Sequence, residues 1–252
     1  MQYLLQFIMI FAMGSISGWV LELFYRRFFS KVNKEKRWIN PGFLVGPCLP
    51  IYGFGLCTLY VLAELPISGI AQEWLRRLVL FCCMAAGMTL IELIAGLICV
   101  DLLHVKLWDY SDRRFNYRGI ICPTFSFYWS LLGAAYYFLI HPHILSALKW
   151  LSTNLMFSFF LGIFFGVLIL DVIYSIQLVS RLRKYAVDNA ILIRYEELKA
   201  QIQSFSERKR NMLYFFFAFR SSHPLTESLR EYLNLRIGEE DFRLLRHRKK
   251  IK

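Results

Sequence analysis

The sequence predicts an all-α integral membrane protein with about five transmembrane helices and a helical cytoplasmic tail. Of its 252 residues, 57% are hydrophobic and 17% are aromatic, which is well above the averages of soluble proteins. A formal charge of +12 on such an apolar chain requires that charged residues be segregated from the apolar runs. Five apolar segments approach the ~20 residues that a helix needs to cross a bilayer. They are residues 3–24, 48–65, 78–100, 121–140 and 155–176.

The second apolar segment is the least regular. It is the shortest of the five and contains Pro50, Gly53 and Gly55, which weaken a continuous helix. Such residues are tolerated at membrane depth where neighbouring groups satisfy the freed backbone. We expect this segment either to cross as a kinked helix or to enter the membrane and return.

Charge alternates between the connectors. The first connector has six cations, the second has two, the third has four and the fourth has one. By the positive-inside rule, the N-terminus is expected outside a cell membrane, and the first loop, the third loop and the tail inside. The cations are Arg26, Arg27, Lys31, Lys34, Lys36 and Arg37, then Arg76 and Arg77, then Lys106, Arg113, Arg114 and Arg118, and finally Lys149.

The chain is expected to divide into a transmembrane domain, residues 1–179, and a basic helical tail, residues 180–252. From Arg181 onward there are 17 Lys/Arg and 9 Asp/Glu, a net charge of +8. A basic segment beside a membrane favours binding to anionic lipid headgroups. Nucleic acid is not an expected partner, because no nucleic-acid-binding motif accompanies the charge.

The tail begins with an apolar stripe. Its members are spaced 4, 3, 4 and 3 residues apart, as in a helical a/d seam. Two outcomes are open: the stripe docks on the protein's own loops, or it forms a coiled coil in a homo-oligomer. The stripe is Ile191, Tyr195, Leu198, Ile202 and Phe205.

Two hairpins resemble each other in sequence. Residues 40–47 lead into the second span and residues 116–123 into the fourth, and both contain Asn, Gly, two apolar residues and then Pro. Glu22 and Glu92 occupy comparable positions in the spans before them. This pattern predicts a parallel repeat of two hairpins, followed by one further helix.

Three acidic residues fall within predicted spans. Glu22, Glu92 and Asp171 all lie on odd-numbered segments, in the half expected to face the cytoplasm. Ionisable groups at membrane depth normally face a bundle interior or a wet cavity, because exposure to lipid is costly. We expect all three to converge on one cavity whose rim is the loop around Asp109 and Arg114. The alternative is a purely structural role in hydrogen bonding between helices.

Residues 108–119 interleave aromatic and charged side chains between the third and fourth spans. Such a mixture indicates either an interfacial anchor or an ordered functional loop. Arginines in it would suit a phosphate clamp. The full set of predicted binding residues is Glu22, Glu92, Asp171, Trp108, Asp109, Tyr110, Arg113, Arg114, Asn116, Arg118, Asn40 and Tyr52.

Several chemistries are not expected. The chain has no G-x-x-x-x-G-K-[ST] motif, so energy from ATP would have to come from an ATPase partner in trans. Its six cysteines form no C-x-x-C pair and are expected to be free thiols. No metal site or cofactor is expected.

Several sequence blocks together point to one family. They are Gly18-Trp19 followed by Glu22, Asn40-x-Gly42-Phe43-Leu44-x-Gly46-Pro47 continuing to Pro50-Ile51-Tyr52-Gly53-x-Gly55, Glu92, Trp108-Asp109-Tyr110-Ser111 with Phe115-Asn116-x-x-Gly119, and Ser126-x-x-Trp129. On these blocks, within residues 10–135, the chain resembles the CmpB-like family. Members of this family are labelled as ABC-transporter permeases and include a group of small eukaryotic transmembrane proteins. The resemblance implies transport and does not extend to the tail.

The sequence leaves three hypotheses for the function. The first is a permease component with a polar cavity lined by the intramembrane carboxylates and energised by a partner. The second is a membrane-embedded enzyme acting on a lipid headgroup or polyprenyl phosphate, with Asp109 or Glu92 as acid or base. The third is a scaffold that acts through its tail.

The topology yields a direct prediction. Single cysteines that replace Lys34 and Arg114 in a cysteine-free background should be protected in intact cells from a membrane-impermeant thiol reagent, because both positions are expected inside. A cysteine at Lys149, expected outside, serves as the labelled control. Labelling of either of the first two from outside would overturn the topology.

Overall fold

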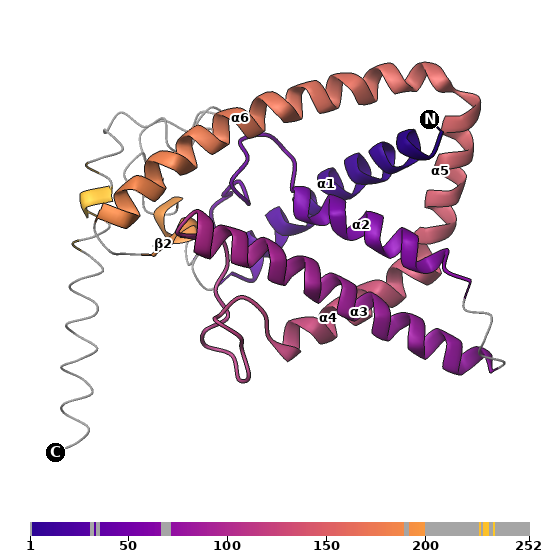
Figure 1. The fold of residues 1–252 in the computed structure, drawn as a ribbon, viewed down its shortest axis with the longest axis horizontal. Helices are drawn as coiled ribbons and strands as arrows, with labels where there is room; N and C mark the ends of the chain where they lie inside the picture. Colours follow the sequence, from indigo (N-terminus) through magenta and orange to yellow (C-terminus); the bar gives the residue numbers. More distant parts are fainter. Residues whose placement is uncertain are drawn as a thin grey trace.

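The computed structural model describes residues 2–30, 33, 36–66, 72–188, 192–199, 227, 229–231 and 234. They are mostly helical, and the two strands have two residues each, which confirms the predicted all-α fold (Figure 1). The elements are α1 (Gln2–Phe28), α2 (Pro50–Ala63), α3 (Glu73–Leu97), η1 (Ile98–Leu102), β1 (Val105–Lys106), α4 (Pro123–Ala135), η2 (Tyr136–Ile140), α5 (His141–Thr153), η3 (Leu155–Phe157), α6 (Ser158–Asp188) and β2 (Ile193–Arg194).

Four helical stretches in the described part of the chain are long and apolar enough to cross a membrane. The second expected segment instead forms α2, a helix of 14 residues. At 1.5 Å per residue α2 is about 21 Å long, shorter than the ~30 Å hydrocarbon core. The four long stretches are Tyr3–Phe28, Glu73–Leu102, Pro123–Thr153 and Leu155–Asp188.

Proline sets the start of three helices. Pro50, Pro123 and Pro142 lie in the first turn of α2, α4 and α5. At that position the missing N–H has no intrahelical acceptor to lose, and the fixed φ suits the helix. Residues 44–49 are not helical, so α2 begins only at Pro50 and is short for this reason. The chain turns at the start of α5, which rises away from α4 (Figure 1).

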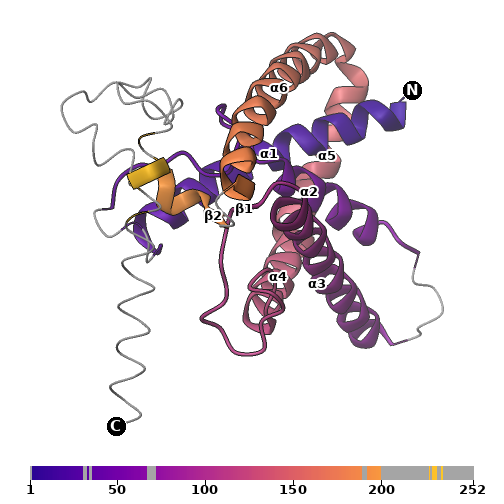
Figure 2. The ribbon, with the colours of Figure 1, turned by 60° about the vertical axis from the view of Figure 1, so that its left-hand side comes forward.

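The helices run in alternating directions. In Figures 1 and 2, α1, α3 and α6 run one way and α2 and α4 run the other. The C-terminal ends of α1 and α6 and the loop between α3 and α4 therefore gather at one end of the bundle. The N-terminus, the end of α2 and α5 lie at the opposite end. The three connectors predicted to be cytoplasmic thus share one end, and the assignment of that end to the cytoplasm stays a prediction.

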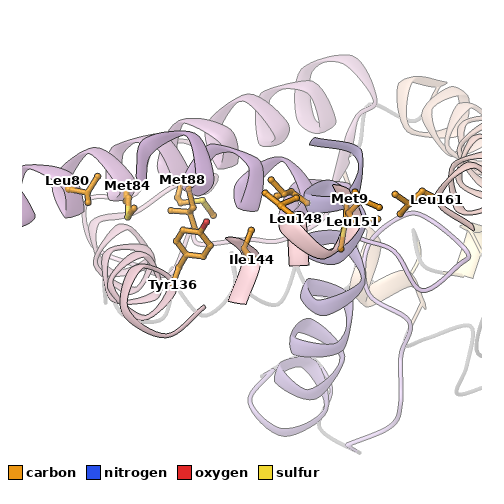
Figure 3. Packing of buried hydrophobic residues seen from close by; sticks show 12 residues of the cluster. Met9, Leu80, Met84, Met88, Tyr136, Ile144, Leu148, Leu151 and Leu161 are labelled. Atoms are coloured by element: carbon orange, nitrogen blue, oxygen red, sulfur yellow. The ribbon is translucent and has the colours of Figure 1, made fainter. Parts of the chain in front are cut away.

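The main apolar core lies where the two hairpins meet. Met84 and Met88 of α3 face Tyr136 across the core, and all three are less than 10% exposed (Figure 3). Glycine allows this close approach. A Cβ on Gly133 would lie 3.0 Å from the Cβ of Met84, and one on Gly55 would lie 2.8 Å from the Met88 methyl group. The helices therefore approach closely beside the methionines.

The predicted tail stripe docks on the protein itself in its described part. Tyr195 and Leu198 are buried in an apolar cluster with Val179 and Leu182 of α6. Next to it, β1 pairs in parallel with β2, with Val105 opposite Ile193. The other stripe members, Ile191, Ile202 and Phe205, lie outside the described residues. Docking is therefore observed for two of the five residues.

Close packing between α1 and α2 leads to a stability prediction. A Cβ on Gly18 would lie 2.2 Å from both the Cβ and the Cγ of Tyr52, whose hydroxyl is fixed by Glu22. Gly18→Ala should therefore lower the free energy of unfolding by about 1–3 kcal/mol, the usual cost of overpacking. Thermal unfolding of the detergent-purified protein measures this.

Gly162→Ala on α6 is the matched control. A Cβ there meets no atom within 4 Å in the described structure, so the substitution should leave the unfolding midpoint unchanged or raise it slightly. Equal destabilisation by both substitutions would contradict the packing of α1 against Tyr52.

Candidate functional site

Glu22 on α1 lies in a charged and hydrogen-bonded environment. Arg26, one turn later, donates from Nε to Glu22 Oε1 over 2.9 Å. Tyr52, in the first turn of α2, donates its hydroxyl to Oε2 over 2.8 Å. The guanidinium of Arg26 also contacts Glu196 Oε2 at 3.0 Å, beyond the end of α6. The negative charge of Glu22 is therefore balanced by a buried arginine.

Glu92 on α3 has different partners. Its side chain is nearly inaccessible, with the residue 4% exposed. Tyr110 donates its hydroxyl to Oε1 over 2.9 Å, and Trp129 donates its indole N–H to Oε2 over 3.0 Å. Burial, with the charge of Glu92 nearby, raises the pKa of Tyr110, so this phenol keeps its proton. Both recorded donors to Glu92 are uncharged.

The two glutamates belong to one cluster. The ring of Tyr52, which binds Glu22, contacts the ring of Trp129, which binds Glu92, with centroids 6.1 Å apart. Neither glutamate touches the other directly, and the two aromatic rings connect them. We call this cluster the carboxylate network: Glu22, Tyr52, Trp129, Glu92 and Tyr110.

Asp171 on α6 has hydrogen-bond partners outside the carboxylate network. Its carboxylate accepts hydrogen bonds from the backbone N–H groups of Val45 and Gly46, at 2.9 and 2.7 Å, and from the Ser175 hydroxyl at 3.1 Å. It thereby attaches the loop before α2 to α6. The structure brings two of the three predicted carboxylates together and gives the third separate partners.

The start of the loop at residues 108–119 faces inward. Trp108 donates its indole N–H to the Ile120 carbonyl over 2.8 Å, and the ring of Tyr110 stacks on Phe125 with centroids 4.1 Å apart. Both aromatic residues therefore serve the packing of the loop, and Tyr110 also binds Glu92.

Asp109 is engaged in ion pairs. Its Oδ1 lies 2.7 Å from Lys106 Nζ and its Oδ2 3.0 Å from Arg194 on β2. Burial alone would raise the pKa of Asp109, but hydrogen bonds from Lys106 and Ser111 outweigh it and hold that pKa below its usual value. Asp109 therefore stays ionised and joins the third loop to the segment after α6.

The tip of this loop is exposed. Arg113 and Arg114 are exposed, and Arg118 pairs with Asp101, with one contact at 3.0 Å. Asn116 shapes the turn, because its side-chain amide donates to the Arg113 carbonyl over 2.7 Å and accepts from the Gly119 N–H over 2.9 Å. Arg113 also lies 4.0 Å from Asp112 Oδ1, so two of the three arginines of the predicted phosphate clamp have a carboxylate beside them.

Asn40 shapes the first loop in a similar way. It is 1% exposed, accepts from the indole N–H of Trp19 over 2.7 Å, and donates to the Val45 carbonyl over 2.7 Å. Two residues later, Gly42 has a φ of +71°, a conformation that glycine adopts without strain. Asn40 is therefore a structural centre of the loop that precedes α2.

Lys199 was not identified from the sequence and occupies a central position. Its Nζ donates to the carbonyls of Asn40 and Gly42 over 3.0 and 2.8 Å and lies 4.7 Å from the centre of the Tyr195 ring. Burial and the nearby Arg26 charge lower the pKa of Lys199 from 10.5 to about 7. The sequence feature that could have identified Lys199 is its spacing. It follows Tyr195 by four residues, so both side chains lie on the same face of a helix.

The Lys199 contacts generate a pH prediction. Between about pH 7 and 10, a released lysine binds a proton that the docked amine lacks, so the unfolded state binds more protons and stability rises with pH. Relative to Lys199→Met, the wild-type protein should therefore gain stability as pH rises from about 7 to 9. Differential thermal unfolding in nanodiscs measures the gain.

Lys184→Met is the matched control, because Lys184 is an exposed lysine near the end of α6. The wild-type protein should show no pH-dependent gain over this variant. A pH-independent difference between wild type and Lys199→Met would contradict a buried neutral amine.

Comparison with known proteins places these residues in a family. Searches among curated proteins and among solved structures gave no match. A family profile described as "Putative ABC-transporter type IV" matches residues 9–176, which include most of α1, α2 to α5, most of α6, the carboxylate network and Asp171. The match covers more than half of the chain, so the protein belongs to the ABC_trans_CmpB family of ABC-transporter-type membrane proteins.

Proposed function

We propose that this protein is the membrane-embedded permease component of a transporter, and that the carboxylate network is the polar site on its transport path. The observation that carries the proposal is the environment of Glu92, a buried carboxylate within a membrane-length helix whose recorded donors are both uncharged. A charged side chain at the centre of a membrane helix costs ~2.5–3.5 kcal/mol on insertion scales. Residues kept at that cost usually mark substrate or ion pathways.

The chemistry of the network suggests what it would bind. Glu22 is balanced by Arg26, whereas Glu92 receives hydrogen bonds from a phenol and an indole. Neither the Tyr110 phenol nor the Trp129 indole carries a positive charge that would neutralise the Glu92 carboxylate. Glu92 is therefore the member of the network best suited to bind a proton or a cationic group of a substrate.

The first loop, the third loop and the segment after α6 meet at the same end of the bundle as the carboxylate network and offer a docking surface for an energising partner. The chain itself has no P-loop, and the family name supports an ATPase partner. Arg26 contacts both Glu22 in the network and Glu196 in the segment after α6. A partner that moved this segment would act on Glu22 through a single side chain. Anionic lipids beside the basic tail remain a proposed second class of partner.

The enzyme hypothesis has less support. Asp109, a proposed acid or base, is held by Lys106 and Arg194, and Glu92 is buried away from the exposed loop tip. The exposed arginines Arg113 and Arg114 still suit contact with lipid phosphate at the membrane surface. They lie at the loop tip with Phe115, which is 88% exposed.

Glu92→Gln tests the proposed function. A glutamine preserves the size of the side chain, can accept from Trp129 through its oxygen, and can donate to the Tyr110 hydroxyl. We expect normal folding and loss of transport. ATP-loaded membrane vesicles that contain the protein and its native partners are incubated with a cell-extract metabolite mixture, and accumulated solutes are identified by mass spectrometry.

Glu73→Gln, at the exposed start of the same helix, is the matched control and should keep wild-type accumulation. Wild-type accumulation by Glu92→Gln would remove the network from the transport path. If wild-type vesicles and vesicles without the protein accumulate the same solutes, the permease proposal fails.

A further inference from the structure

A second buried polar cluster lies at the end of the bundle opposite the carboxylate network. His141, the first residue of α5, lies between two oxygen atoms. Its Nδ1 is 2.9 Å from the Tyr136 hydroxyl, and its Nε2 is 3.0 Å from Glu64 Oε1, just beyond the end of α2. These contacts join α2, η2 and α5 through one imidazole.

The exposure of the three side chains decreases from the surface of the bundle to its core. The Glu64 side chain is 49% exposed, the His141 side chain is 11% exposed, and Tyr136 is 1% exposed. The other titratable groups recorded against the imidazole are the phenols of Tyr60 and Tyr137, at centroid distances of 6.0 and 6.3 Å. Glu64 is thus the charged group recorded against His141 in the described residues.

Both polar clusters belong to the same helix interface. Met84, Met88 and Glu92 follow one another at four-residue intervals on α3, and each is less than 10% exposed. Tyr136 belongs to the core cluster that contains the two methionines (Figure 3), and Trp129 packs against that cluster. The methionines therefore form an apolar layer between the carboxylate network at one end and the His141 cluster at the other.

We propose that Glu64, His141 and Tyr136 form a proton-binding site that opens to the end of the bundle where the N-terminus lies. Histidine is the side chain whose charge ordinarily changes between pH 5 and 8. A proton bound at this cluster would be a ligand in addition to the solute proposed for the carboxylate network. Only the biological role of this proton site rests on the proposed transport function.

Proton uptake has a defined consequence for Tyr136. In the neutral cluster, Nε2–H donates to Glu64, and Nδ1 accepts from the Tyr136 hydroxyl. A proton taken from water binds Nδ1 and makes the imidazole a cation. The phenol oxygen must then accept from Nδ1–H and turn its own proton away into the core. The protonation state of the surface cluster is thereby transmitted to a side chain beside the methionine layer.

The test is an NMR titration of the full chain in nanodiscs, with ¹⁵N-histidine and ¹³Cζ-tyrosine labels. Signals are assigned through His141→Gln and Tyr136→Phe. We expect His141 to gain a second ring proton between about pH 8 and 5, and the Tyr136 signal to change with the same midpoint. In His141→Gln, the Tyr136 signal should not change over this range.

Glu64→Gln should change the His141 midpoint, because it removes the charged group recorded against the imidazole in the described residues. His143→Gln is the matched control: His143 is exposed two residues further along α5, and its removal should leave the midpoint unchanged. A wild-type His141 that does not titrate in this range, or a Tyr136 signal that does not follow it, would overturn the proposal. The titration involves no ATP and no transported solute, so its failure is separate from failure of the permease proposal.

Discussion

The buried guanidinium of Arg26 is the interaction on which the candidate site depends. It joins Glu22 inside the bundle to Glu196 in the segment after α6, and the residue is only 8% exposed. A buried cation is tolerated only when it is paired, and removing one partner of a buried ion pair typically costs ~3–5 kcal/mol. The transmembrane bundle and the segment after α6 are therefore energetically coupled at this residue.

The surrounding contacts extend this coupling to all three connectors at the same end. Lys199 binds the carbonyls of the first loop, Arg194 binds Asp109 of the third loop, and Asp171 binds the first loop from α6. These contacts link residues that lie at least 85 positions apart in the sequence. A rearrangement of any one connector must break charged or charge-assisted hydrogen bonds, so the three are expected to move together.

Within the bundle, polar and apolar layers alternate along one helix interface. The carboxylate network and the His141 cluster each place a buried ionisable group among hydrogen-bond partners, and methionines separate them. Methionine is flexible and adapts its shape to its surroundings, whereas the glycines beside it allow the helices to approach closely. This arrangement suits a barrier that can repack, which is the physical requirement for access from one end at a time.

Hydropathy and helical period are local properties, and they predicted the helical class, the apolar segments, the grouping of the cationic connectors and the inward position of Glu22 and Glu92. Pro50 also indicated an irregular segment. Which side chains meet follows from the packing of the helices. Tyr52 and Trp129 connect the two glutamates, Asp171 takes separate partners, and Lys199 and His141 become buried. These outcomes depend on how helices distant in sequence are rotated and spaced against one another, which no local pattern specifies.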